Sequence, residues 1–252
     1  MQVSSLGHCA HRRRAALTTL HLMHARALVL LLLCAPRAAP ITVGPDTKPN
    51  VNGNLILLDG CVHPWQGPSA DVSSPIQDQT TGKRTVIGTL AQMGEEDAVR
   101  AVEAAATAWD RGQGEWPQMP LAGRIERVEA VVAALKERRD EILNVLMWEI
   151  CKSEPDAAAE FDRTMEFIQK TIETLRVMDE EGARWRVVSG VMAYMRRAAI
   201  GVMLLLGPFN YPFNETYAAL IPALLMGNVI VMKLPAIGPP GQHRTPSPDP
   251  EP

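Results

Sequence analysis

Residues 200–236 follow an order of strand, turn, helix and strand that only a few folds accommodate. An apolar run over residues 202–206 stops at Gly207-Pro208, and a helical spacing of apolar side chains follows over residues 218–224. A second apolar run over residues 229–232 comes after the Gly227-Asn228 turn and finishes on Lys233. This order predicts a βαβ unit with two buried parallel strands, and therefore an α/β fold.

Two side chains of this unit can take part in chemistry. Asn210 lies in the turn after the first strand, where its amide N–H could donate to an oxygen that gains charge. Lys233 ends the second strand, and its ammonium could bind a ribose hydroxyl or a phosphate. Ligands bind at the carboxyl ends of strands in open α/β sheets, so one shared pocket is expected. The alternatives are a turn amide that caps the next helix and an ordinary surface lysine.

The residues around these two positions resemble the aldehyde dehydrogenase superfamily over roughly residues 51–235. The matching motifs occur in order and at the family's spacing: Pro208-Phe209-Asn210-Tyr211-Pro212, Pro222-Ala223-Leu224, Gly227-Asn228 and Lys233. The resemblance implies the N-terminal part of a Rossmann-type cofactor domain with a protruding β-hairpin arm. It also implies oxidation of an aldehyde by a cysteine nucleophile, a nicotinamide that accepts hydride, and a glutamate that activates water.

The same resemblance gives roles to individual residues. Asn210 corresponds to the donor to the oxyanion, and Lys233 to the lysine that holds the adenosine ribose, with Pro208 and Phe209 in the cofactor-contacting turn. Where NAD-preferring relatives often carry a glutamate, this chain has Ala236. Without that carboxylate, a 2′-phosphate is not repelled, so NADP is the expected cofactor and NAD the alternative.

The substrate can be narrowed by a further likeness to NADP-dependent non-phosphorylating glyceraldehyde-3-phosphate dehydrogenases. Arg163 and Tyr211 occupy the positions that bind the substrate phosphate in that group, and a guanidinium with a phenol suits a phosphate monoester. The resemblance therefore implies glyceraldehyde 3-phosphate as substrate. The alternative is an ordinary helical arginine paired with Glu160, Asp162 or Glu166.

Residues 185–199 form two short extended pieces around Ser189-Gly190 and are too apolar for a free hairpin in water. In the resembling family this segment is an arm that pairs with another subunit, which implies a homo-oligomer. Packing of the hairpin within the chain is the alternative. Further hairpins are predicted around Asp59-Gly60 and Thr81-Gly82, and helices over residues 95–109, 121–151 and 155–178.

The family's later parts are missing from the sequence. None of the four cysteines stands in the context of the nucleophile, and the family's glutamate and its glycine turn for the pyrophosphate are absent. We therefore expect a fragment, truncated before the nucleophile and inactive alone. The alternative is a natural short form that binds full-length subunits without catalysis.

The two ends of the chain differ from its middle. Residues 1–50 are interpreted as a leader, residues 51–236 as the partial cofactor domain and residues 237–252 as a disordered Pro-rich tail. The leader contains arginines but no acidic residue before Asp46, so a secretory signal, an organelle transit peptide and a non-native extension all remain open. Free thiols indicate a reducing compartment, and the cytoplasm is expected. A net charge of −3 gives no basic surface for nucleic acid, and no cysteine spacing indicates a metal site.

Overall fold

The computed structural model describes residues 48–234, and its N-terminal part is a set of short strands. Strands β2 (Leu55–Leu58) and β3 (Cys61–Pro64) form a hairpin, and Asp59 and Gly60 adopt φ angles of 49° and 68° in its turn. Strand β4 (Ser69–Gln77) pairs antiparallel with β5 (Arg84–Ala91), and β1 (Val51–Gly53) adds to β5 in parallel. This pairing confirms both predicted hairpins. They form because the turn residues tolerate the left-handed backbone that tight hairpins need.

Helix α3 (Glu95–Trp109) has the bounds that the apolar spacing predicts. Its first turn is acidic, and the Asp97 carboxylate accepts from the Gly94 N–H at 3.1 Å, which stabilises the positive end of the helix. The short helices η2 (Asp110–Gly112) and α4 (Glu115–Gln118) then lead into α5 (Leu121–Glu137).

The prediction of a single helix over residues 121–151 was wrong, because the helix is interrupted at Arg138. Helix α5 ends there and α6 (Arg139–Ile150) starts, with Arg138 at φ −105° and ψ 18°. The Arg138 guanidinium donates to Glu141 at 2.7 Å, and the acidic pair Asp140 and Glu141 lies in the first turn of α6. These charges stabilise a new helix start, and the bend turns Leu143 and Leu146 into the same core as α5.

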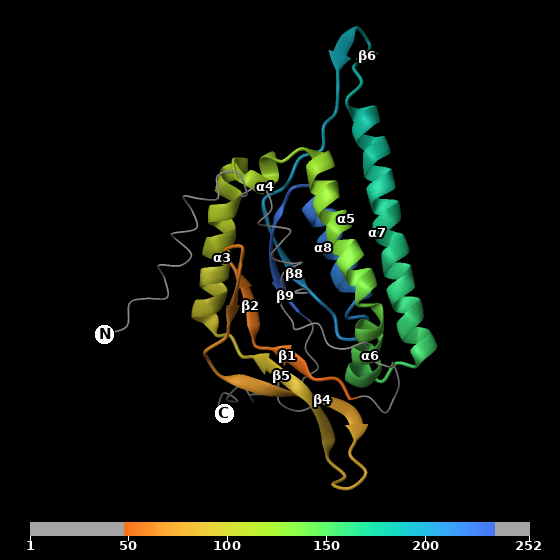
Figure 1. The fold of residues 1–252 in the computed structure, drawn as a ribbon. Helices are drawn as coiled ribbons and strands as arrows, with labels where there is room; N and C mark the ends of the chain where they lie inside the picture. The colour runs from red at the N-terminus through yellow and green to blue at the C-terminus, as the bar shows by residue number, and fades with distance from the viewer. Residues whose placement is uncertain (1–47, 235–252) are drawn as a thin grey trace, which may run out of the picture.

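Helix α7 (Glu154–Gly182) is the longest element and leads into the arm. It starts at the Ser153 cap, whose hydroxyl accepts from the Asp156 N–H at 3.3 Å, and it runs beyond the predicted end. Strands β6 (Arg186–Val188) and β7 (Val191–Ala193) form a hairpin beyond its last turn, and all their residues are exposed. Figure 1 shows this hairpin projecting from the body, which confirms a protruding arm within the described chain.

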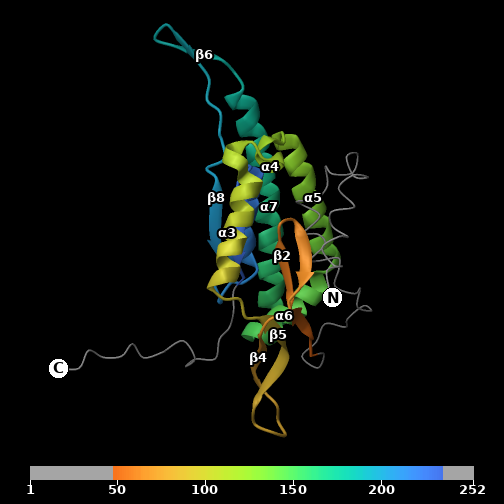
Figure 2. The same cartoon turned by 90° about the vertical axis from the view of Figure 1, so that its left-hand side faces the viewer.

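The predicted βαβ unit is confirmed by β8 (Val202–Leu206), α8 (Asn214–Leu225) and β9 (Val229–Lys233). The two strands pair in parallel, from Val202 opposite Val229 to Leu206 opposite Lys233. Helix α3 packs against one side of this pair, and α8, backed by α5 and α7, packs against the other (Figures 1 and 2). The result is the layered arrangement of an α/β domain.

The expected burial of β8 is only partly observed. Val202, Leu204 and Leu206 are 38%, 64% and 66% exposed, whereas the alternate residues Met203 and Leu205 are half-buried. Parallel strands are normally covered on both faces. Among the described residues, no element buries these three side chains.

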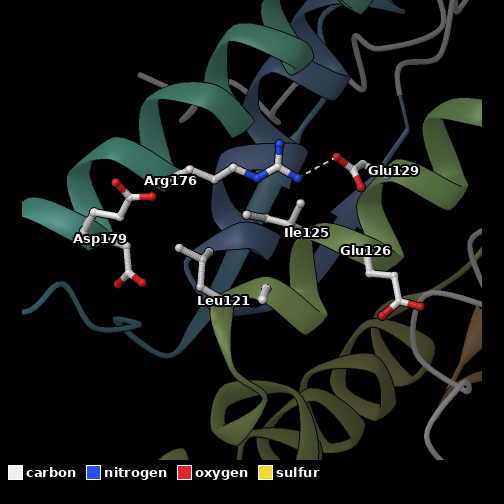
Figure 3. Close-up of a pocket in the computed structure, with 8 residues that line it drawn as sticks. Leu121, Ile125, Glu126, Glu129, Arg176 and Asp179 are labelled. Atoms are coloured by element: carbon white, nitrogen blue, oxygen red, sulfur yellow. Dashed lines mark hydrogen bonds and ion pairs between the residues drawn. The ribbon is translucent and has the colours of Figure 1, made fainter. Parts of the chain in front are cut away.

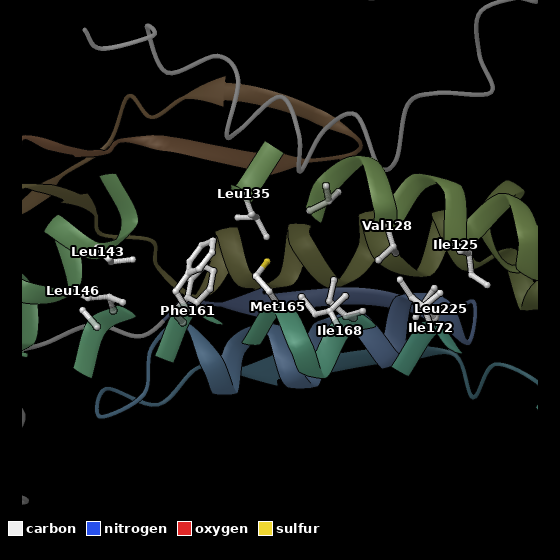
Figure 4. Close-up of a cluster of buried hydrophobic side chains, with 14 residues drawn as sticks. Ile125, Val128, Leu135, Leu143, Leu146, Phe161, Met165, Ile168, Ile172 and Leu225 are labelled. Carbon is white, nitrogen blue, oxygen red and sulfur yellow. The ribbon is translucent and has the colours of Figure 1, made fainter. Parts of the chain in front are cut away.

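The main core lies among the helices (Figure 4). Apolar stripes of α5, α6, α7 and α8 meet there, and Phe161 stacks on Phe213 with ring centroids 5.3 Å apart. The buried members are Ile125, Val128, Val131, Leu135, Leu143, Leu146, Ala157, Phe161, Met165, Ile168, Ile172, Phe213, Ile221 and Leu225. Packing of α7 on α8 therefore holds the βαβ unit against the helical layer.

The leader and tail predictions, including Ala236, lie outside the described residues. Within residues 48–234, no helix is long and apolar enough to cross a bilayer.

Candidate active site

The turn after β8 and the end of β9 lie at the same edge of the parallel pair. Leu206 is in register with Lys233, and the Gly207 N–H donates to the Lys233 carbonyl at 3.1 Å, which continues the pairing past β8. Pro208, Phe209 and Asn210 follow at once, and Phe209, Asn210 and Lys233 are exposed. Neighbouring carboxyl ends of parallel strands are the usual place for a ligand in an α/β domain.

Asn210 does not cap the helix that follows it. The first amides of α8 are bound by another residue, since the Glu160 carboxylate of α7 accepts from Phe213 and Asn214. The Asn210 side chain has no hydrogen-bond partner within residues 48–234. Its amide is therefore available to a ligand at this edge, as an oxyanion donor requires.

The Lys233 side chain is also available to a ligand. Its side chain is exposed and forms no ion pair with any residue between 48 and 234. A strand-end ammonium of this kind fits a ribose hydroxyl or a phosphate, so the described residues are compatible with a nicotinamide dinucleotide. When bound, such a cofactor supplies the acceptor for a hydride.

Tyr211 lies against two cationic side chains. The Lys152 ammonium is 4.0 Å from the centre of the Tyr211 ring, and the Arg163 guanidinium is 5.3 Å from it. Both contacts are within the range of cation–π attraction. The fold thus brings Arg163 and Tyr211 together from positions far apart in the sequence, and it adds Lys152, which the sequence analysis did not select.

None of the carboxylates considered as partners of Arg163 binds it in the structure. Glu160 pairs with Lys152, Asp162 with Arg139, and Glu166 with Lys170. Arg163 is exposed, and its contact with Tyr211 is the interaction that the described part of the chain offers it. The alternative of an intrahelical ion pair was therefore wrong, because each acidic neighbour is held by a different cation.

Sequence reasoning missed the pairing of Glu160 with Lys152. The Glu160 side chain is fully buried and that of Lys152 is 15% exposed, and the two form an ion pair. Glu160 falls at helical spacing from the buried Ala157 and Thr164, on the apolar stripe of α7. An acidic residue on a core-facing stripe signals a buried partner, and this signal was available in the sequence.

A hollow between two helices lies away from this edge (Figure 3). It holds about 210 Å³ between α5 and α7, next to the ion pair of Arg176 and Glu129 at 2.9 Å. Arg176 is 13 positions after Arg163 on one helix, which separates the hollow from the candidate site by about 20 Å along the axis. Four of its eight lining residues are acidic and one is basic, so it does not suit a phosphate or a dinucleotide.

Neither described cysteine belongs to β8, to β9 or to the turn that carries Asn210. Cys61 starts β3, and Cys151 is the exposed, left-handed residue that ends α6. Within residues 48–234, no group of His, Cys, Asp and Glu side chains is arranged to hold a metal ion.

Comparison with known proteins identifies the fold. The model of the aldehyde dehydrogenase family matches residues 68–241, more than half of the chain. The chain belongs to the aldehyde dehydrogenase family. This aldehyde dehydrogenase chain is 30% identical over 182 residues to an NADP-dependent glyceraldehyde-3-phosphate dehydrogenase of Nicotiana plumbaginifolia, which covers 69% of the chain and 35% of the relative. It is also 30% identical over 195 residues to an alpha-ketoglutarate semialdehyde dehydrogenase of Haloferax volcanii, which covers 77% of the chain and 37% of the relative.

A solved relative supports the same assignment. The NADP-dependent glyceraldehyde-3-phosphate dehydrogenase of Bacillus halodurans, in complex with NADP, superposes with a TM-score of 0.59 at 26% identity. The match covers 73% of this aldehyde dehydrogenase chain and 37% of the solved chain. The chain therefore spans little more than a third of the length of these relatives.

Proposed function

We propose that this chain carries the oxyanion donor and the ribose-binding lysine of an NADP-dependent aldehyde dehydrogenase that oxidises glyceraldehyde 3-phosphate to the acid. The observation that supports it most is the register of β8 and β9, which brings Lys233 opposite Leu206, directly before the turn that carries Asn210. Both side chains are exposed and uncommitted within residues 48–234. Asn210 then donates to the developing oxyanion, a contribution typically worth about 3 kcal/mol of barrier.

The cofactor proposal is NADP, held at Lys233, with Pro208 and Phe209 in the contacting turn. The exposed ammonium of Lys233 supports a contact to the adenosine ribose, and a chain with Ala236 in place of a carboxylate lacks a charge that would repel a 2′-phosphate. Two of the relatives named above are NADP-dependent by name.

The substrate proposal is a phosphorylated aldehyde bound by Arg163 and Tyr211. Arg163 keeps its donors available because its acidic neighbours pair with other cations, and its guanidinium carbon lies 5.3 Å from the centre of the Tyr211 ring. A planar fork next to a phenol suits a phosphate monoester.

Nucleotide binding by the 252-residue chain tests the cofactor proposal. NADP is expected to bind more tightly than NAD in calorimetric titration, and Lys233→Met is expected to weaken NADP binding about tenfold or more, because one charge-assisted hydrogen bond is lost. Lys170→Met, which removes an exposed lysine of α7, is the matched control and should leave the affinity unchanged. Equal binding by Lys233→Met and the unmodified chain would rule out this role for Lys233.

We also propose that these residues alone do not turn over substrate. None of the four cysteines stands in the family's nucleophile context, and Asn210 then has no oxyanion to stabilise. The purified chain is expected to reduce no NADP in the presence of glyceraldehyde 3-phosphate. Turnover in a clean preparation would contradict this proposal.

A second candidate function is a non-catalytic short form that associates with full-length subunits through residues 185–199. The exposed apolar arm favours it, since Val187 and Met192 form a cross-strand pair and are 70% and 63% exposed. Co-purification with an intact aldehyde dehydrogenase would support this function. Val187→Asp with Met192→Asp should abolish it, whereas Met93→Asp, at an exposed apolar site away from the arm, should not.

A further inference from the structure

The Glu160 carboxylate is buried at a point where a charge is costly unless it is fully bound. Its side chain has no exposed surface, and Lys152 is its ion-pair partner. One carboxylate oxygen accepts from the Phe213 N–H at 3.1 Å and from the Asn214 N–H at 2.9 Å. The other oxygen accepts from Lys152. A buried carboxylate bound in this way is satisfied, and removing one partner would leave an uncompensated charge.

These bonds fix the start of α8 relative to α7. No side chain of the local sequence caps α8, because Phe213 occupies the cap position. The two amides are instead bound from α7, and the Thr164 hydroxyl of the same helix reaches the Asn214 side chain at 3.1 Å. Tyr211 precedes Phe213 by two residues, and its carbonyl accepts from the Glu215 N–H at 3.1 Å. A shift at Phe213 must therefore also move the turn that carries Asn210.

Lys152 connects the Glu160 carboxylate to the Tyr211 side chain. While its ammonium is held by Glu160, it lies 4.0 Å from the centre of the Tyr211 ring, on a side chain that is only 15% exposed. The position of Lys152 thus depends on Glu160, and the orientation of Tyr211 depends on Lys152.

We propose that Glu160 is a positioning residue of this site. Through its bonds to Phe213 and Asn214, and through Lys152, it sets the orientation of Asn210 and Tyr211 without touching a substrate itself. This inference rests on the proposed function, in which Asn210 and Tyr211 bind the reacting aldehyde.

Nuclear magnetic resonance of the isotope-labelled 252-residue chain tests the positioning directly. Glu160→Gln keeps the size and one acceptor oxygen but removes the charge that holds Lys152. The expected result is a change of chemical shift for the backbone amides of Phe213 and Asn214, the side-chain amide of Asn210 and the ring of Tyr211. The control Glu166→Gln removes a carboxylate from the exposed face of the same helix and should leave these signals in place. Unchanged Asn210 and Tyr211 signals in Glu160→Gln would overturn the proposal.

Titration with inorganic phosphate adds a readout that a loss of stability alone would not move. Glu160→Gln is expected to weaken phosphate binding at Arg163 and Tyr211 about tenfold, because one of two cations is misplaced. Failure of the unmodified chain to bind phosphate or NADP would count against the proposed function. The magnetic resonance signals of Asn210 and Tyr211 would still test the positioning role of Glu160.

A double variant covers the case in which Glu160→Gln does not fold. Glu160→Gln with Lys152→Met removes both charges together and leaves no uncompensated ion. It should fold and still show displaced Asn210 and Tyr211 signals, and native positions for both would overturn the proposal. If neither variant folds, amide hydrogen exchange of the unmodified chain tests whether Glu160 holds the amides of Phe213 and Asn214. Protection of Phe213 and Asn214 is expected, and exchange at the rate of open amides would refute it.

Discussion

At the scale of single residues, Asn228 shows how one buried amide can join three segments. Its side-chain oxygen accepts from the N–H groups of Ile200 and Gly201 at 2.6 and 3.1 Å. Its side-chain nitrogen donates to the Ala223 carbonyl at 3.0 Å. Asn228 therefore ties the end of α8 to the approach to β8, and its role is structural.

Replacement of Asn228 should be costly. Asn228→Ala is expected to lower the free energy of unfolding by about 3 kcal/mol, because buried backbone groups lose their partners. Chemical denaturation followed by circular dichroism measures the difference. Asn52→Ala, at an exposed asparagine, should change it by less than about 0.5 kcal/mol. Equal effects of the two substitutions would contradict the assigned role.

A second single residue makes stability depend on pH. Burial raises the pKa of the Glu149 carboxyl above its ordinary value of 4.5, so the folded chain binds this proton more tightly than the unfolded chain. The contribution is fully present below the ordinary pKa and is lost as pH rises through the raised one. Glu149→Gln should therefore flatten the fall in stability above pH 4.5 and stabilise the chain at neutral pH. Melting curves across this range measure it, and the exposed Glu137→Gln should leave the slope unchanged.

At the scale of elements, the C-terminal end of α8 depends on one arginine of α5. The Arg124 guanidinium donates to the carbonyls of Leu225 at 2.8 Å and of Met119 in the turn before α5. Burial lowers the pKa of Arg124, a cost that these bonds offset. Orphan carbonyls at a helix end are satisfied here by a side chain from another helix.

Loss of this contact should loosen α8. Arg124→Met is expected to destabilise the chain by about 2–3 kcal/mol, because partly buried carbonyls remain without a donor. Hydrogen exchange should show the loss first in the last turn of α8. Arg100→Met removes a 62% exposed side chain of α3 and should cost less than about 0.5 kcal/mol. An unchanged exchange rate at the end of α8 would contradict the prediction.

At the scale of the whole molecule, the uncovered apolar face of β8 is expected to control association with other chains. Val202, Leu204 and Leu206 are exposed side by side on one face of a parallel strand, a position that other elements normally cover. An apolar strip of this kind favours association with other chains.

Self-association should therefore respond to a charge on this face. The unmodified chain is expected to form larger species as its concentration rises in sedimentation velocity, and Leu204→Lys should weaken this association about tenfold or more, about 1.4 kcal/mol. Val177→Lys makes the same kind of change at a 55% exposed residue of α7 and should have no effect. A monomeric unmodified chain at all concentrations would contradict the prediction.

The local spacing of apolar and turn residues was sufficient to predict most helices and strands, and the sheet edge that carries Asn210 and Lys233. The bounds of α3 and β8, the turns at Gly60 and Gly190, and the order that places Asn210 and Lys233 at neighbouring strand ends all follow from spacing within one segment. Such spacing reflects burial of one face and the conformational freedom of turn residues, and both can be predicted without knowledge of distant contacts.

Tertiary structure alone decided the partners of Glu160. The partners of Glu160 are Lys152, eight positions before it, and two amides more than fifty positions after it. The sequence allowed a pairing of Glu160 with Arg163, but packing of α7 on α8 turned Glu160 into the core and left Arg163 outside against Tyr211. An ion pair between two elements depends on the relative placement of those elements, and periodicity within one element does not contain that information.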